Sequence, residues 1–203
     1  MLFQILKVLV GFYYKVFFRL KVTGKENIPK NEPFLLCANH LSLQDPILLT
    51  LVMGQKLRYM AKEELFKNKL LASVIRSFGA FPVKRGSGDM GIIEASSEIV
   101  EGGEILMVFP QGTRDKHRKG LKGHTGAARI ACRSGVKILP VGITDNYRLF
   151  GRLCVHIGTP VDCSLYQGKE LSQTEYVGIT QSVMGQIYDL SGIHPKKRIG
   201  DTK

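Results

Sequence analysis

Pro33-Phe-Leu-Leu-Cys-Ala38 is followed directly by Asn39-His-Leu-Ser-Leu-Gln-Asp45 and then by Pro46. The first stretch is an apolar run between a proline and an asparagine, which is typical of a buried β-strand. The pair Asp45-Pro46 has the form of a helix N-cap followed by proline at the first helical position. The segment therefore predicts a strand, a polar turn and a helix in succession.

The rest of the chain repeats this alternation. Further apolar runs that predict buried strands lie at residues 57–61, 80–83, 105–109 and 138–143. Helical periodicity is found at 65–75, at 92–100 before Gly102-Gly103, and after the capping box Ser172 to Glu175. We therefore predict one α/β layered domain, with a central, largely parallel or mixed sheet flanked by helices.

Composition and charge limit the classes of protein to which the chain can belong. The 203 residues are 44% hydrophobic and 23% charged, as in an ordinary globular domain that buries its own core. The four cysteines show no CxxC spacing, so we expect reduced thiols in a cytosolic setting. The net charge of +12 predicts a negatively charged partner, such as nucleic acid, anionic lipid or a phosphorylated metabolite.

The first twenty residues predict an amphipathic helix. Lys7, Lys15 and Arg19 recur with Gln4 and Gly11 along one narrow stripe, and the rest of the helix is apolar or aromatic. A spanning helix would bury three cations, each costing about 2.5–3.5 kcal/mol near the bilayer centre. We therefore expect the helix to lie in the membrane interface. The alternative is a helix packed on the domain's own core.

His40 and Asp45 are the first candidate site. Histidine acts as a base at neutral pH, and a carboxylate brought back by the turn would fix its tautomer. The alternative is a capping histidine beside an aspartate that serves only as an N-cap. Ser42 suggests a hydrolase but lacks the GxSxG elbow, and Cys37 lies in a predicted strand.

Two further polar segments each follow a predicted strand. Residues 79–89 end a strand in Lys84-Arg85 and a glycine-rich loop, which favours anion binding. Residues 109–122 contain FPQGTR and place five cations within residues 114–122. No aromatic residue is interleaved there for base stacking, so a phosphorylated small molecule or an acidic carrier fits better than nucleic acid. Solvated charges without a ligand are the alternative for both.

Four blocks carry a family resemblance: NHLSLQD at 39–45, GAFPVKR at 79–85, FPQGTR at 109–114 and LPVGI at 139–143. In order and spacing the chain resembles the glycerolipid acyltransferases, in particular 1-acylglycerol-3-phosphate acyltransferases of the PlsC type, over roughly residues 20–190. The resemblance implies an enzyme that acylates lysophosphatidic acid to phosphatidic acid, using acyl-CoA or acyl-carrier protein, with no cofactor, no metal and no covalent acyl-enzyme. Together with the amphipathic pattern of the first segment, it predicts a membrane-anchoring helix at residues 1–20, a catalytic domain at 21–203 and a location at the cytoplasmic face of the cell membrane.

The resemblance also implies site roles. His40 would be the general base and Asp45 its orienting partner. The remaining assignments are the acceptor-phosphate ligands Arg85, Arg114 and Lys62, the acceptor-site loop Gln111, Gly112 and Thr113, and the donor-site residue Pro140.

Position 111 departs from the family pattern, which reads FPEGTR. Glutamine keeps the shape of glutamate but loses its charge and gains an NH2 donor. We expect a carboxylate there to pair with Arg114 or Arg85, so that Gln111→Glu increases turnover. The alternatives are an acyltransferase for another lysolipid, or a catalytically weakened, membrane-binding homologue.

Overall fold

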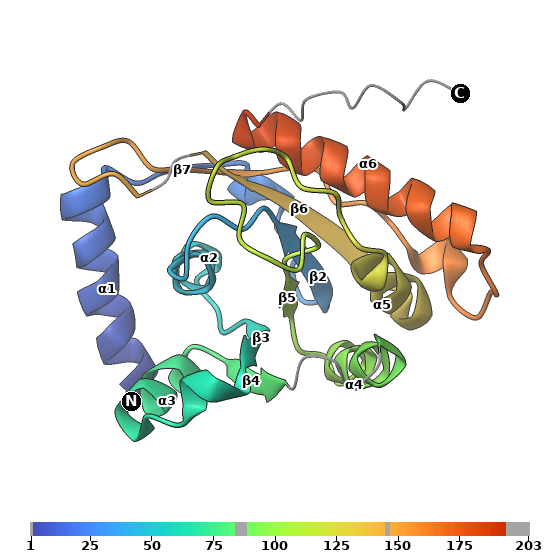
Figure 1. The fold of residues 1–203 in the computed structure, drawn as a ribbon, viewed down its shortest axis with the longest axis horizontal. Helices are drawn as coiled ribbons and strands as arrows, with labels where there is room; N and C mark the ends of the chain where they lie inside the picture. Colours follow the sequence, from blue (N-terminus) through green and yellow to red (C-terminus); the bar gives the residue numbers. More distant parts are fainter. Residues whose placement is uncertain (1, 84–88, 145–146, 194–203) are drawn as a thin grey trace.

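The computed structural model describes residues 2–83, 89–144 and 147–193. Its core is a seven-stranded sheet with the order β1-β7-β6-β2-β5-β3-β4 (Figure 1). The strands are β1 Lys21–Thr23, β2 Phe34–Ala38, β3 Arg58–Lys62, β4 Ala80–Val83, β5 Leu106–Val108, β6 Lys137–Ile143 and β7 Cys154–Ile157. Neighbouring strands are parallel except β6 and β7, so the predicted largely parallel, mixed sheet is confirmed.

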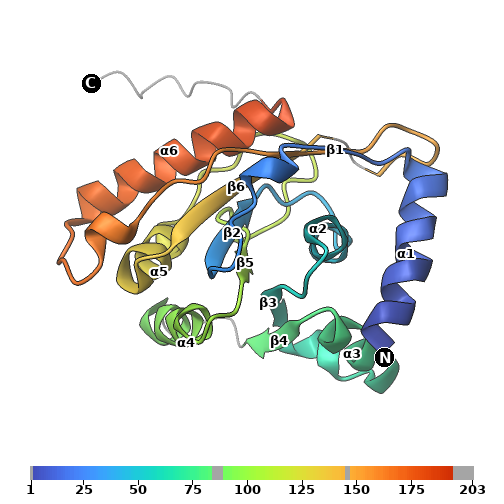
Figure 2. The same cartoon turned by 180° about the vertical axis from the view of Figure 1, so that it is seen from behind.

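Helices cover both faces of this sheet. They are α1 Leu2–Phe18, α2 Asp45–Met53, α3 Lys69–Ser77, α4 Asp89–Glu101, α5 Gly126–Ser134 and α6 Gln173–Ser191. Helices α4, α5 and α6 form a layer on one side, and α2 lies on the other with α1 outside it (Figures 1 and 2). The predicted capping box begins α6: Ser172 accepts from the amide of Glu175, whose carboxylate accepts from the amide of Ser172.

The predicted strands are all present, but the helical pattern at 65–75 is divided. A 3₁₀ turn at Glu63–Phe66 comes first, and α3 begins only at Lys69. The side chain of Asn68 accepts a hydrogen bond from the amide of Leu71 and so starts a new helix. The short strands β1 and β7 and the alanine-rich helix α5 were not predicted.

Helix α1 has two different faces. Tyr14 and Phe18 are buried in the domain core, so the packed alternative holds for this side of the helix. Lys7 is also turned toward the domain, where its ammonium donates to the carbonyl of Gly54 at the end of α2. On the other side Val8 and Phe12 are 72% and 66% exposed.

None of the helices in the described ranges is both long enough and apolar enough to cross a bilayer.

Candidate active site

The His40 turn and the FPQGTR loop, two of the polar segments chosen from the sequence, lie at the same edge of the sheet. Strands β2, β3, β4, β5 and β6 run parallel, so their carboxyl ends lie together. Strand β2 lies between β6 and β5, and the His40 turn and the 109–114 loop follow β2 and β5 at this edge. Ligand sites of open α/β sheets commonly lie at such an edge.

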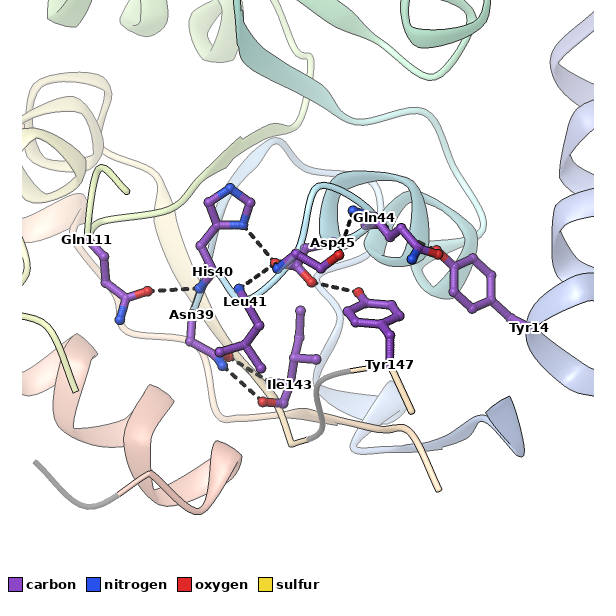
Figure 3. Close-up of polar contacts among 10 residues, drawn as sticks. Tyr14, Asn39, His40, Leu41, Gln44, Asp45, Gln111, Ile143 and Tyr147 are labelled. Carbon is purple, nitrogen blue, oxygen red and sulfur yellow. Dashed lines mark hydrogen bonds and ion pairs between the residues drawn. The ribbon is translucent and has the colours of Figure 1, made fainter. Parts of the chain in front are cut away.

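His40 and Asp45 form a hydrogen-bonded pair (Figure 3). His40 Nδ1 lies 2.7 Å from Asp45 Oδ2, and the same oxygen accepts from the amides of Leu41 at 2.6 Å and Ser42 at 2.8 Å. The expectation that Asp45 is an N-cap is wrong: Gln44 is the N-cap, and Asp45 is the first helical residue. Its carboxylate turns back to the preceding loop, because three donors converge there.

The imidazole ring of His40 packs against an aromatic ring and is partly exposed to solvent. It stacks on Phe109 with ring centroids 4.1 Å apart and an interplanar angle of 17°. The side chain is 17% exposed, whereas Asp45 is fully buried. Since Nδ1 faces the carboxylate, Nε2 is the nitrogen available to exchange a proton, and it has no hydrogen-bond partner among the described residues. This arrangement suits a general base whose partner fixes the tautomer.

The start of the turn is fixed by Asn39, whose role was not recognised from the sequence. Its buried amide donates to the carbonyl of Ile143 at 2.9 Å and accepts from the amide of Ile143 at 2.7 Å. These two bonds join the carboxyl ends of β2 and β6 directly before His40 (Figure 3). An asparagine immediately after a buried strand was the available signal.

Gln111 supports the backbone of the turn that carries His40. Its Oε1 accepts from the amide of His40 at 2.8 Å, and its Nε2 donates to the hydroxyl of Tyr188 at 3.2 Å. The hydroxyl of Tyr188 in turn donates to the carbonyl of Leu121. Gln111 is only 2% exposed, whereas Arg114 is exposed. The expected partnership of position 111 with Arg114 is therefore replaced by buried contacts to His40 and Tyr188.

The basic loop is folded around Asp115, a buried residue that sequence reasoning missed. Its amide donates to the carbonyl of His40 at 2.7 Å, and its carboxylate accepts from the amides of Lys119 and Gly120. Arg118, counted among the loop cations, donates to the carbonyls of Thr144 and Ser191. Arg118 therefore anchors the loop to the end of β6 and to α6.

The other residues predicted to bind the acceptor differ in where they lie and in what the structure shows of them. Thr113 and Arg114 are exposed in the loop after β5, and Lys62 is exposed at the end of β3. Gly112 has a φ of +66°, a conformation that other residues adopt only with strain. Arg85 lies outside the described residues, so its assignment stays a prediction.

Pro140 lies inside the sheet. It is buried in β6, paired in register with Cys37 of β2, and its carbonyl accepts from the amide of Gly158. A proline is tolerated here because its nitrogen points to the same side as this carbonyl, where β7 has already ended at Ile157. Its role toward the acyl donor stays a prediction.

The side chains proposed for a hydrolase are placed for other roles. Cys37 is fully buried in β2, and burial raises the pKa of its thiol well above the usual range. The hydroxyl of Ser42 accepts from the amide of Gln44. In the ranges that the structure describes, no group of three or more His, Cys, Asp or Glu side chains is placed to hold a metal ion.

Comparison with known proteins assigns the family. The family model described as Acyltransferase matches residues 19–144, which is more than half of the chain. The chain belongs to the acyltransferase family. The matched region contains His40, Asp45 and the loop of Gln111.

Several relatives of this acyltransferase chain carry a more specific name. The chain is 33% identical to a 1-acyl-sn-glycerol-3-phosphate acyltransferase of Bacillus subtilis, over 70% of this chain and 73% of that protein. It is 33% identical to an enzyme of the same name from Streptococcus pneumoniae, over 68% of this chain and 54% of that protein. The crystal structure of the 1-acyl-sn-glycerophosphate acyltransferase PlsC of Thermotoga maritima superposes with a TM-score of 0.74 and 28% identity, covering 96% of this chain and 81% of that one.

Proposed function

We propose that this acyltransferase transfers an acyl chain from a thioester, acyl-CoA or acyl-carrier protein, to the free hydroxyl of 1-acylglycerol-3-phosphate. The product is phosphatidic acid. The observation that carries the proposal is the His40–Asp45 pair, with Nε2 left available at the sheet edge that also holds the FPQGTR loop. The names of the relatives support the acceptor.

The mechanism follows from the geometry of the pair. His40 Nε2 takes the proton of the acceptor hydroxyl while the hydroxyl oxygen attacks the thioester carbonyl carbon. Asp45 stabilises the imidazolium that forms. When the tetrahedral intermediate collapses, the C–S bond breaks, the sulfur takes the proton from Nε2, and the ester remains on the acceptor. No residue is acylated, so Ser42 and Cys37 are not required.

Cations at the same edge would hold the acceptor phosphate. Arg114 and Lys62 are exposed there, and Arg85 completes the set proposed from the sequence. A guanidinium binds phosphate through two parallel hydrogen bonds, which orients the glycerol as well as attracting it.

We also propose that the protein lies on the cytoplasmic face of the cell membrane. The exposed apolar face of α1, which includes Val8, Leu9 and Phe12, would enter the interface, and Lys15 and Arg19 would meet anionic headgroups. Both substrates carry long acyl chains, so an enzyme bound at the surface need not extract them into water.

The test is acyl transfer by the purified full-length chain in vesicles that contain lysophosphatidic acid or other lysolipids, with acyl-CoA or acyl-carrier protein as donor. His40→Ala should reduce the rate about 10² to 10⁴-fold. His156→Ala is the control, because His156 lies in β7 and contacts Thr23 of β1, the outermost strand on that side of the sheet. Absence of transfer by the folded wild-type chain with every pair of substrates would refute the proposal.

A further inference from the structure

The two oxygens of the Asp45 carboxylate are held in different ways. Oδ2 takes the bonds from His40, Leu41 and Ser42, all within the local turn. Oδ1 accepts from the hydroxyl of Tyr147 at 2.6 Å, and this is its one partner among the described residues. Because Asp45 is fully buried, no solvent replaces that bond if the hydroxyl is lost.

Tyr147 comes from a distant part of the chain and is held in an uncommon conformation. It follows β6 and is 102 residues away from Asp45, and its φ is +58°. Burial and the charge of Asp45 raise the pKa of its phenol well above the usual range. The phenol therefore stays protonated and always offers its hydrogen to the carboxylate.

The ring of Tyr147 is supported by α1. Its centroid lies 6.2 Å from that of Tyr14 and 5.9 Å from that of Phe18, the latter in an edge-to-face arrangement. The hydroxyl of Tyr14 also donates to the side chain of Gln44, the N-cap directly before Asp45 (Figure 3). Helix α1 thus contacts Tyr147, which holds the buried carboxylate, and Gln44, the residue directly before Asp45.

We propose that Tyr147 is a positioning residue that orients Asp45, and through it His40, and that the packing of α1 keeps Tyr147 in place. The inference rests on the proposed acyl transfer by His40. Its consequence is that the N-terminal helix does more than attach the protein to a surface. It also determines how well the imidazolium is stabilised during the reaction.

Tyr147→Phe is the direct test, because it removes the hydroxyl and keeps the ring. The kcat should fall about tenfold to a hundredfold, as for loss of one hydrogen bond to a charged group. The KM for acceptor and donor should change less than about twofold, because Tyr147 contacts neither substrate. Tyr13→Phe makes the same chemical change in the same aromatic cluster without a bond to Asp45, and it should leave kcat unchanged.

The contribution of α1 is tested by a double-mutant cycle. Phe18→Leu keeps an apolar side chain at this buried position but removes the ring that faces Tyr147. If α1 acts through the hydroxyl of Tyr147, Phe18→Leu should cost little further activity in the Tyr147→Phe background. Losses that multiply independently would overturn the link to α1.

A spectroscopic readout separates this inference from the proposed reaction. The proton shared by His40 Nδ1 and Asp45 should give a low-field ¹H resonance that is absent in His40→Ala. It should shift or broaden in Tyr147→Phe and remain in Tyr13→Phe. A resonance and a kcat both unchanged in Tyr147→Phe would overturn the positioning role. If the wild type transfers no acyl group, the proposed function fails, and the resonance alone decides whether Tyr147 orients the pair.

Discussion

Gln111→Glu is the substitution for which the sequence and the structure give opposite predictions. The sequence predicts faster turnover, whereas the contacts of Gln111 predict lower stability and slower turnover. The phenol of Tyr188 has one proton, which it donates to the carbonyl of Leu121. Burial raises the pKa of this phenol, so the proton is retained. Tyr188 therefore presents a lone pair to position 111. The NH2 group of glutamine fits that lone pair, whereas a carboxylate oxygen meets it as a second acceptor.

The size of the effect follows from burial. Gln111 is 2% exposed, so a mismatched polar contact there should cost about 1–3 kcal/mol of unfolding free energy. For a chain of this size that loss lowers Tm by about 2–12 °C. Because the other oxygen holds the amide of His40, a shift of the turn should also lower turnover, by up to about 10²-fold.

The loss of stability in Gln111→Glu should depend on pH in one direction. A glutamate that is buried at position 111, with one oxygen facing the lone pair of Tyr188, has its folded-state pKa raised above the unfolded value of about 4.3. Its protonated form supplies the missing donor, so the variant should approach wild-type stability below about pH 4. The deficit should grow as the pH rises, because the charged form is favoured only in the unfolded chain.

The assay measures Tm from about pH 3 to about pH 8, on both sides of the unfolded-state pKa of glutamate, and turnover at saturating donor. Gln173→Glu is the matched control: position 173 is exposed at the first turn of α6, where Gln173 already accepts from Arg129 and a negative charge is favourable. Its Tm should be unchanged or slightly higher. Unchanged Tm and equal or faster turnover in Gln111→Glu would refute the reasoning.

The remaining predictions concern the carboxylate, the acceptor site and the membrane. Asp45→Asn should lower both kcat and Tm in rate and melting assays, because its NH2 group must face one of the donors that now converge on the carboxylate. Arg114→Ala should raise the KM for a phosphorylated acceptor and leave that for the donor nearly unchanged; equal losses with a phosphate-free acceptor would remove Arg114 from this role. Lys15→Glu with Arg19→Glu should weaken binding to anionic vesicles in a flotation assay by about 1 kcal/mol per cation lost, without the damage that Lys7→Glu would cause at Gly54.

The sequence predicted those features whose physical cause is local. Strand β2 is a continuous apolar run, and His40 and Asp45 are separated by one turn, so both were visible without the fold. Strand β1 has only three residues and is largely exposed, so it lacks an apolar run. Helix α5 is only nine residues long, and the residues that it buries are small or of mixed type: Ala127, Ala128, Ile130, Ala131, Cys132 and Ser134.

The parts of the site that could not be predicted from the sequence are contacts between distant segments of the chain. Tyr147 reaches Asp45 only because β6 pairs with β2, and Tyr188 reaches Gln111 only because α6 packs on β6. Gln111 was predicted as a site position beside Arg114, and its hydrogen bonds to His40 and Tyr188 were not foreseen. Its neighbour in the sequence, Arg114, is exposed, and its true contacts are 71 and 77 residues away.

The two hydrogen bonds between Asn39 and Ile143 also affect when the site can form during synthesis of the protein at the ribosome. The turn that carries His40 and Asp45 is synthesised early, but the side-chain amide of Asn39 finds its partner only after 104 more residues have been added. Bringing together residues this far apart in the chain costs loop-closure entropy before the contact stabilises the fold, so such pairings form slowly. During translation the nascent chain therefore carries its histidine and aspartate before β6 exists to fix the turn. Catalytic competence should appear only once the chain has emerged past β6 and Tyr147, which would spare the cell acyl transfer by incomplete chains.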